Sequence, residues 1–84
     1  MTRYFFNITN GTVVTDHDGT EFADLGEARQ AAVKLFCSIV ADDPSLVLKR
    51  SDFSIEVTDE RGLVMFLVQM LTVSSPAAKG AGAG

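Results

Sequence analysis

The hydrophobic pattern is most informative between Leu63 and Val73, where apolar residues occupy almost every position. Only Gln69 and Thr72 interrupt the run. Successive side chains of a β-strand point to opposite faces of the sheet, so this segment predicts a strand that is apolar on both faces. A domain with a single helix can cover only one of these faces. We therefore expect the other face to contact a partner.

Three further segments have the composition and alternation of strands, and short polar turns separate them. Asn10-Gly11 predicts a two-residue hairpin turn, and Asp59–Gly62 predicts a second hairpin turn that ends in glycine. The three segments are Tyr4–Thr9 with Tyr4, Phe6 and Ile8 inward, Thr12–Thr15, and Phe53–Thr58 with Phe53, Ile55 and Val57 inward.

One amphipathic helix is predicted between the two hairpins. Asp24 is a typical N-cap residue, and Glu27 three residues later completes a capping-box pattern. The helix is expected to end at Asp42-Asp43-Pro44, because the residue before proline is displaced from helical geometry. Apolar residues recur at the three- and four-residue spacing of one helix face, namely Leu25, Ala28, Ala32, Leu35, Phe36 and Ile39.

The order of these elements predicts an α+β fold, β-β-α-β-β, in which one helix packs on one face of a four-stranded antiparallel sheet. Residues 1–73 form the predicted domain, and the Ala/Gly-rich residues 74–84 form a tail that we expect to be disordered. Ser45–Asp52 is interpreted as a loop whose apolar residues fold back on the domain edge, with one helical turn as the alternative.

Composition narrows the function classes. The 84 residues carry a net charge of −4 with scattered basic residues, which argues against nucleic acid as a partner. The N-terminal apolar run is too short for a signal peptide, and no run reaches the ~20 residues of a membrane helix. We expect a cytoplasmic protein with no membrane partner. The single Cys37 excludes an internal disulfide, and because small domains often need extra stabilisation, oligomerisation is favoured.

Several separated motifs resemble those of a known family. They are Arg3-Tyr4-Phe5-Phe6, Asp18-Gly19-Thr20-Glu21, Asp24-Leu25 before an Ala-rich helix, and Glu56-Val57-Thr58-Asp59-Glu60 followed by Gly62 and Val64. This pattern, from Thr2 to Met70, resembles a family of short bacterial proteins known as a domain of unknown function and abundant in rhizobia and related alphaproteobacteria. The resemblance implies a bacterial cytoplasmic protein and brings no known activity, substrate or catalytic residue.

The last strand departs from the family pattern. Relatives usually have polar residues at the positions of Leu63, Leu67 and Leu71, whereas this chain is apolar throughout. The departure predicts that Val64, Phe66, Val68 and Met70 face the helix. A weaker likeness, at the level of fold, is to the sheet-plus-helix domain of HicB-type antitoxins, which bind a toxin and form oligomers. That likeness favours a binding module.

Candidate chemistry is sparse. The Asp16–Glu21 segment is the one cluster of potential metal ligands, but it lacks the further acids of a calcium loop, so we interpret it as a solvated turn. His17 has no positioned partner for acid–base catalysis. Cys37 lies at the border of the apolar helix face, where partial burial as a small hydrophobic residue is expected. Tyr4 and Phe5 suggest base stacking, but the acidic charge favours packing.

The sequence therefore predicts a non-enzymatic module without a cofactor, metal or catalytic residue. It is expected to be a homodimer, or to bind another protein, through the open sheet face. The alternative is a small-ligand-binding protein or enzyme that uses a cleft between the Asp16–Glu21 and Ser45–Asp52 loops. The predicted interface residues are Phe5, Leu63, Met65, Leu67 and Leu71.

Overall fold

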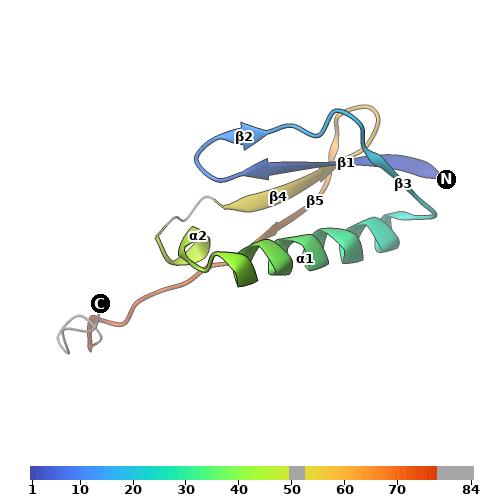
Figure 1. Cartoon of the computed structure of the whole chain (residues 1–84). Coiled ribbons are helices and arrows are strands. Elements are labelled where there is room, and N and C mark those ends of the chain that lie inside the picture. The colour runs from blue at the N-terminus through green and yellow to red at the C-terminus, as the bar shows by residue number, and fades with distance from the viewer. Residues whose placement is uncertain (50–52, 78–84) are drawn as a thin grey trace.

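The computed structural model describes residues 1–49 and 53–77. A single antiparallel sheet forms one layer, and the long helix crosses one of its faces (Figure 1). The elements in chain order are β1 (Thr2–Thr9), β2 (Val13–Val14), β3 (Thr20–Phe22), α1 (Leu25–Asp42), α2 (Ser45–Leu48), β4 (Ser54–Thr58) and β5 (Val64–Gln69). The predicted β-β-α-β-β fold is confirmed, with β3 and α2 as short additions.

The strands lie in the order β2-β1-β4-β5. β1 pairs with β4 from Phe5 to Thr9, which joins the two predicted hairpins through their first strands. β3 pairs with the beginning of β1, from Thr2 to Tyr4, and was not among the strands that the sequence predicted. β5 lies at the edge of the sheet. The strand that is apolar on both faces therefore has a strand neighbour on one side.

The first hairpin has a longer turn than the sequence predicted. Thr9 pairs with Val13, so three residues, Asn10 to Thr12, connect β1 and β2. Gly11 has a φ of 92°, but Asn10 has a negative φ, since among the described residues only glycines have positive φ. A two-residue type I′ turn needs positive φ at both central positions. Because Asn10 does not adopt it, the predicted two-residue turn is wrong.

The start of α1 has the predicted Asp24–Glu27 pair, a capping box whose return hydrogen bond goes to Ala23, the residue before the N-cap. The Asp24 carboxylate accepts the backbone N–H of Glu27 at 2.9 Å, and the Glu27 carboxylate accepts the N–H of Ala23 at 3.1 Å. Two N–H groups that have no partner within the helix are thereby satisfied. The helix ends at Asp42, before Pro44, as predicted.

The core lies between α1 and the sheet face that it covers. Ala28 and Ala32 are fully buried, and their small side chains let the helix approach Tyr4 and Val57 closely. Towards the end of the helix, Phe36 and Phe53 stack with ring centroids 4.9 Å apart. The inward positions predicted on the first and third strands are confirmed as buried or packed against the core, and these are Tyr4, Phe6, Ile8, Phe53, Ile55 and Val57.

The segment after α1 differs from its interpretation as a loop. Ser45–Leu48 forms the helical turn that was the alternative, and Val47 is buried against Phe36 and Ile55. This packing occurs on the face of the sheet that α1 covers. The remainder of the predicted loop, residues 50–52, lies outside the described residues.

Two of the four positions predicted to face the helix do not do so, namely Val64 at the start of β5 and Met70 just beyond its end. Phe66 and Val68 pack against the core as expected, but Val64 and Met70 are 55% and 43% exposed. The register explains Val64, because Val57 pairs with Phe66 while Thr58 pairs with Val64. This irregularity inserts one residue into β5 and shifts its start relative to the regular alternation.

Beyond β5 the chain runs away from the body of the protein (Figure 1). One hydrogen bond connects this segment to α2, because the Thr72 hydroxyl donates to the Val47 carbonyl oxygen at 2.8 Å. Residues 74–77 are exposed, and residues 78–84 of the predicted tail lie outside the described residues. No helix among the described residues is long and apolar enough to span a bilayer.

Candidate interaction surface

The face of the sheet opposite α1, called the open face here, is polar at its centre. Glu56 of β4 lies between Asn7 of β1 and Leu67 of β5 in the pairing register. Ser54 of β4 likewise lies between Thr9 and Gln69. Cross-strand partners project from the same face, so the exposed apolar side chains on this face lie towards its two edges, at Val13 of β2, which pairs with Thr9, and along β5.

The exposed apolar residues continue along the edge strand and past its end. Four of the predicted interface residues, Leu63, Met65, Leu67 and Leu71, are among them, with exposed fractions of 52, 40, 49 and 79%. We call the whole set the edge row, and it consists of Leu63, Val64, Met65, Leu67, Met70, Leu71 and Val73. The sequence pattern therefore located most of the exposed apolar surface of β5.

Phe5, the fifth predicted interface residue, lies in a different environment. It is half-buried, and a Cβ on Gly19 would come within 2.8 Å of its ring. The Arg3 guanidinium fixes the same loop by donating to the Asp18 carbonyl oxygen at 3.0 Å. Phe5 also lies two strands away from β5, opposite Thr58. The chain's own loop thus covers much of Phe5, which the edge row does not include.

Asp16 organises that loop. Its carboxylate accepts the N–H groups of Gly19, Phe6 and Asp18 at 3.0, 3.2 and 3.1 Å. The N–H of Gly19 foremost, with those of Phe6 and Asp18, holds the pKa of the Asp16 carboxyl below its ordinary value despite partial burial. Asn7 accepts the Asp16 backbone N–H in return at 3.0 Å. The predicted polar turn is thus a hydrogen-bonded structural unit.

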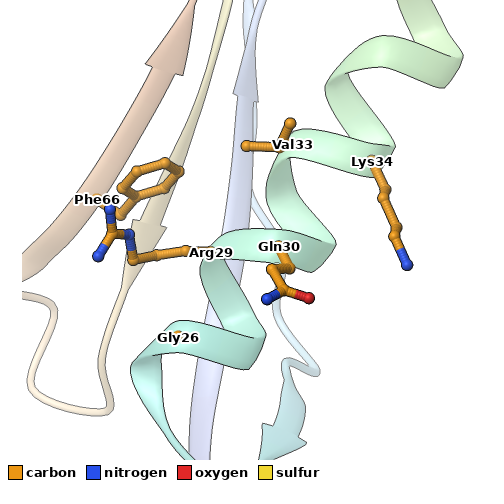
Figure 2. A pocket seen from close by; sticks show the side chains of 6 residues that line it. All are labelled: Gly26, Arg29, Gln30, Val33, Lys34 and Phe66. Atoms are coloured by element: carbon orange, nitrogen blue, oxygen red, sulfur yellow. The ribbon is translucent and has the colours of Figure 1, made fainter.

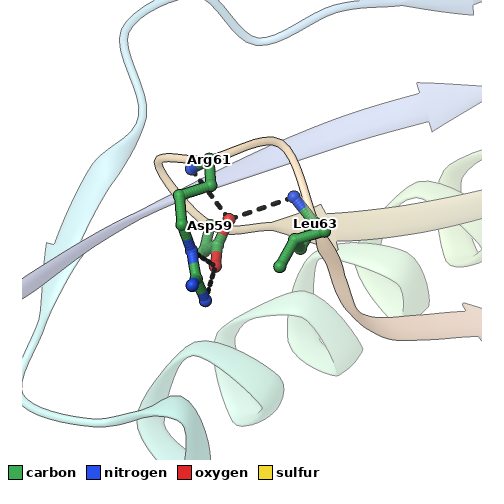
Figure 3. A network of polar contacts seen from close by, with 3 residues as sticks. All are labelled: Asp59, Arg61 and Leu63. Atoms are coloured by element: carbon green, nitrogen blue, oxygen red, sulfur yellow. Dashed lines mark hydrogen bonds and ion pairs between the residues drawn. The ribbon is translucent and has the colours of Figure 1, made fainter.

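A second carboxylate fixes the turn that leads into the edge row (Figure 3). Buried Asp59 accepts the N–H groups of Arg61 and Leu63 at 2.8 and 3.0 Å, and the Arg61 guanidinium nitrogens at 3.0 and 3.2 Å. Burial alone would raise the pKa of the Asp59 carboxyl, but these hydrogen bonds and the Arg61 charge together lower it. The start of β5 is therefore held firmly in register.

An open groove of about 500 Å³ lies between α1 and β5 (Figure 2). The Arg29 guanidinium carbon stands 5.1 Å from the centre of the Phe66 ring, a cation–π geometry. Val33, 41% exposed, belongs to the helix wall. The residues that line the groove are Gly26, Arg29, Gln30, Val33, Lys34 and Phe66.

The groove was not anticipated, and it does not coincide with the cleft that the alternative function required. None of its lining residues belongs to the Asp16–Glu21 or Ser45–Asp52 segments. Arg29 and Phe66 are far apart in sequence, so only the packing of α1 beside β5 brings them together. The apolar Val33 beside Lys34, outside the predicted apolar helix face, was the one local signal.

The remaining candidate residues have simple surroundings. His17 is exposed in its turn. Cys37 is also exposed, so the expectation of partial burial was wrong, since its position on α1 faces away from the sheet. Within residues 1–49 and 53–77, no three His, Cys, Asp or Glu side chains form a group that could hold a metal ion.

The fold and this surface define a small sheet-and-helix domain with an apolar edge strand. The chain belongs to the family described as Domain of unknown function (DUF6894), which matches residues 3–72. This confirms the resemblance to a family of unknown function. Neither a comparison with curated proteins nor one with solved structures gives a match.

Proposed function

We propose that this protein is a non-enzymatic interaction module that self-associates through the apolar residues of β5. The observation that carries the proposal is the exposure of the edge row. On β5 apolar residues occupy successive positions, where a strand with one solvent-facing side normally alternates apolar and polar residues. Apolar side chains are 40 to 81% exposed there, over a stretch of one strand and its extension. A continuous apolar surface of this kind marks an interaction site more often than a solvated surface.

The packing of α2 supports the proposal. The apolar Ser45–Leu48 segment was expected to fold back on the domain edge, where it could have covered the outer residues of β5. Val47 instead packs into the core with Phe36, Phe53 and Ile55, on the face that α1 covers. Among the described residues, no segment therefore shields Met65 and Leu67 from water.

The biological setting is part of the same proposal. We infer a bacterial, cytoplasmic protein from the resemblance of the Arg3-Tyr4-Phe5-Phe6 start and the later motifs to alphaproteobacterial relatives. The fold-level likeness to the HicB-type antitoxin domain supports a binding role in place of catalysis. The acidic charge of −4 is consistent with a protein partner and unfavourable for a nucleic-acid backbone.

The proposal is tested by changing Leu67 to Lys and measuring mass by light scattering or sedimentation over a range of concentrations. The native chain is expected to show a dimer that dissociates on dilution. Leu67→Lys should be monomeric, because it places a charge where the partner would exclude water. An unchanged mass for this variant would contradict a role for the outer β5 residues.

Val14→Lys is the matched control. Val14 is 57% exposed on β2 at the opposite edge of the sheet, so it receives the same charge at an apolar position whose exposure is similar to the 49% of Leu67. It should leave the mass of the native dimer unchanged. Circular dichroism of both variants establishes that each has kept its fold. A native chain that is monomeric at every concentration would overturn the proposed function itself.

A further inference from the structure

We propose that self-association occurs by antiparallel pairing of β5 with β5 of a second copy, so that two sheets join edge to edge in one continuous sheet. This inference rests on the proposed function and specifies its geometry. The alternative arrangement, in which two open faces stack on each other, uses a different surface. The two arrangements differ in whether the backbone of β5 is bonded to the partner.

The free edge of β5 from Phe66 to Gln69, beyond the irregularity at its start, lacks the features that normally prevent such pairing. Among the described residues, no strand pairs with its outer side. Exposed edge strands are usually protected by charged side chains, proline, shortness or a β-bulge, and the bulge of β5 lies before Phe66. β5 has six residues, and the sequence has no Asp, Glu, Lys or Arg from Gly62 to Ala78.

The direction of the backbone groups follows from the pairing register. The Phe6 N–H points away from β4, because it donates to Asp16 on the other side of β1. Backbone groups alternate along a strand, so Val57, opposite Phe6, directs its groups to β5 and bonds with Phe66. The N–H and C=O groups of Leu67 and of Gln69 must then point outward from the sheet. They are available to a second strand.

A second copy is the occupant that this edge fits best. A two-fold axis perpendicular to the sheet pairs the edge with itself and leaves both α1 helices on the same side. Centred on Leu67, it places Leu67 opposite Leu67 on the open face and Phe66 opposite Val68 on the helix side. Both pairs are apolar. Two chains of net charge −4 repel each other least where neither contributes an acidic residue, and neither the edge row nor the lining of the groove beside it contains one.

The groove beside α1 lies along the same edge (Figure 2). Val33 and Phe66 border it, so pairing of the edges would bring the groove of one copy against the helix of the other. The partly exposed Val33 would then be shielded together with the edge row. One geometry thus accounts for apolar exposure on both β5 and the flank of α1.

The available area is sufficient for a weak, specific dimer. The seven side chains of the edge row are 40 to 81% exposed. At roughly 100 Å² of apolar surface for each fully exposed side chain, they offer on the order of 400 Å² per copy. Edge pairing covers only the part of this surface that faces the partner strand, so with the strand backbone and the groove the pair buries at most about 1,000 Å² in total, the range of weak, transient interfaces. Association is therefore expected to depend on concentration.

The other candidate contacts are less suitable. β2 and β3 occupy the opposite side of the sheet with two and three residues, and the Asp16 turn separates them. The centre of the open face carries Glu56 and Asn7, which stacking of two open faces would desolvate. Edge pairing leaves both of these side chains in water.

The test uses a matched pair of substitutions at Gln69. Gln69→Pro removes the outward N–H without affecting the bonding of β5 to β4, since proline is tolerated in a strand where its N–H side faces solvent. Gln69→Ala keeps the N–H and removes the polar side chain. Edge pairing predicts that Gln69→Pro weakens dimerisation at least tenfold in sedimentation, whereas Gln69→Ala changes it less than threefold.

Amide hydrogen exchange of the full chain gives a second measurement. The N–H groups of Leu67 and Gln69 should exchange slowly at high concentration and rapidly after dilution to the monomer. If the chain is dimeric but these two N–H groups exchange rapidly and Gln69→Pro dimerises as the native chain does, edge pairing is overturned while self-association stands. If the chain is monomeric throughout, the proposed function fails and this geometry fails with it.

Discussion

The Asp16 carboxylate accepts the backbone N–H of Phe6 at 3.2 Å, at the point where β1 has no strand on the side away from β4. β2 pairs with the end of β1 and β3 with its beginning, which leaves the N–H of Phe6 unpaired between them. The Asp16 side chain thus supplies the hydrogen-bond acceptor that a neighbouring strand would otherwise provide. The same carboxylate also accepts the N–H groups of Asp18 and Gly19, which joins the turn to the sheet.

Replacing Asp16 with Ala should therefore destabilise the fold. Three N–H groups lose their acceptor, and leaving partly buried donors unsatisfied costs roughly 1–3 kcal/mol. Asp16→Asn should have a smaller effect, because one acceptor oxygen remains. Urea unfolding measures the free energy of unfolding of each variant and of the native chain. Asp18→Ala is the control in the same turn, since the described hydrogen bonds of Asp18 involve only its backbone, and its stability should stay within about 0.5 kcal/mol of the native value.

Stability should fall in acid because of two carboxylates. The pKa values of Asp16 and Asp59 are lowered in the folded protein from an ordinary value of 3.8. The two carboxylates contribute fully to the free energy of unfolding above the ordinary pKa. This contribution is lost as the pH falls below the ordinary pKa towards the lower pKa of the folded protein. Urea midpoints measured between about pH 6 and pH 2 should decrease below about pH 4.

The double substitution of Asp16 and Asp59 by Asn provides the control for this pH dependence. Neither amide titrates, so the variant should be less stable than the native chain at neutral pH and should lose less on acidification. An equal acid-induced loss in both proteins would show that other carboxyl groups cause it.

Alanine substitutions at two glycines distinguish the destabilisation caused by backbone conformation from that caused by steric clash of an added Cβ. Gly19 and Gly62 have φ values of +71° and +82°, which alanine adopts at a cost of about 1–2 kcal/mol. A Cβ at Gly19 would lie 2.8 Å from both Arg3 and Phe5, whereas one at Gly62 would meet nothing within 4 Å. Gly19→Ala should thus destabilise the fold clearly more than Gly62→Ala in thermal unfolding. Equal losses would mean that the loop does not rest on Phe5.

Local signals in the sequence predicted the parts of the fold that local chemistry determines. Asp24 and Glu27 are three residues apart and cap α1 without help from the rest of the chain. The alternation in β4 likewise placed Ile55 and Val57 in the core. Each signal lies within a few residues, and therefore the pattern was sufficient.

Features that depend on distant pairing were not predictable in this way. The irregularity opposite Thr58 turns Val64 outward, and it arises from the register between two strands. The groove requires Arg29 to lie over Phe66, which only the packing of α1 creates. The exposed outer residues of β5 were found because their pattern is continuous, while the covering of Phe5 by the Gly19 loop left no trace in the local sequence.

Val47 and Leu48 are neighbours in α2 with opposite surroundings. Val47 is buried with Phe36 and Phe53, whereas Leu48 is 69% exposed. Val47→Ala should lower the free energy of unfolding by roughly 2 kcal/mol, through the lost burial of two carbons and the cavity that remains. Leu48→Ala removes more atoms but should change it by less than about 0.5 kcal/mol. Urea unfolding of both variants decides the matter, because a larger loss for Leu48→Ala would mean that α2 turns its other side to the core.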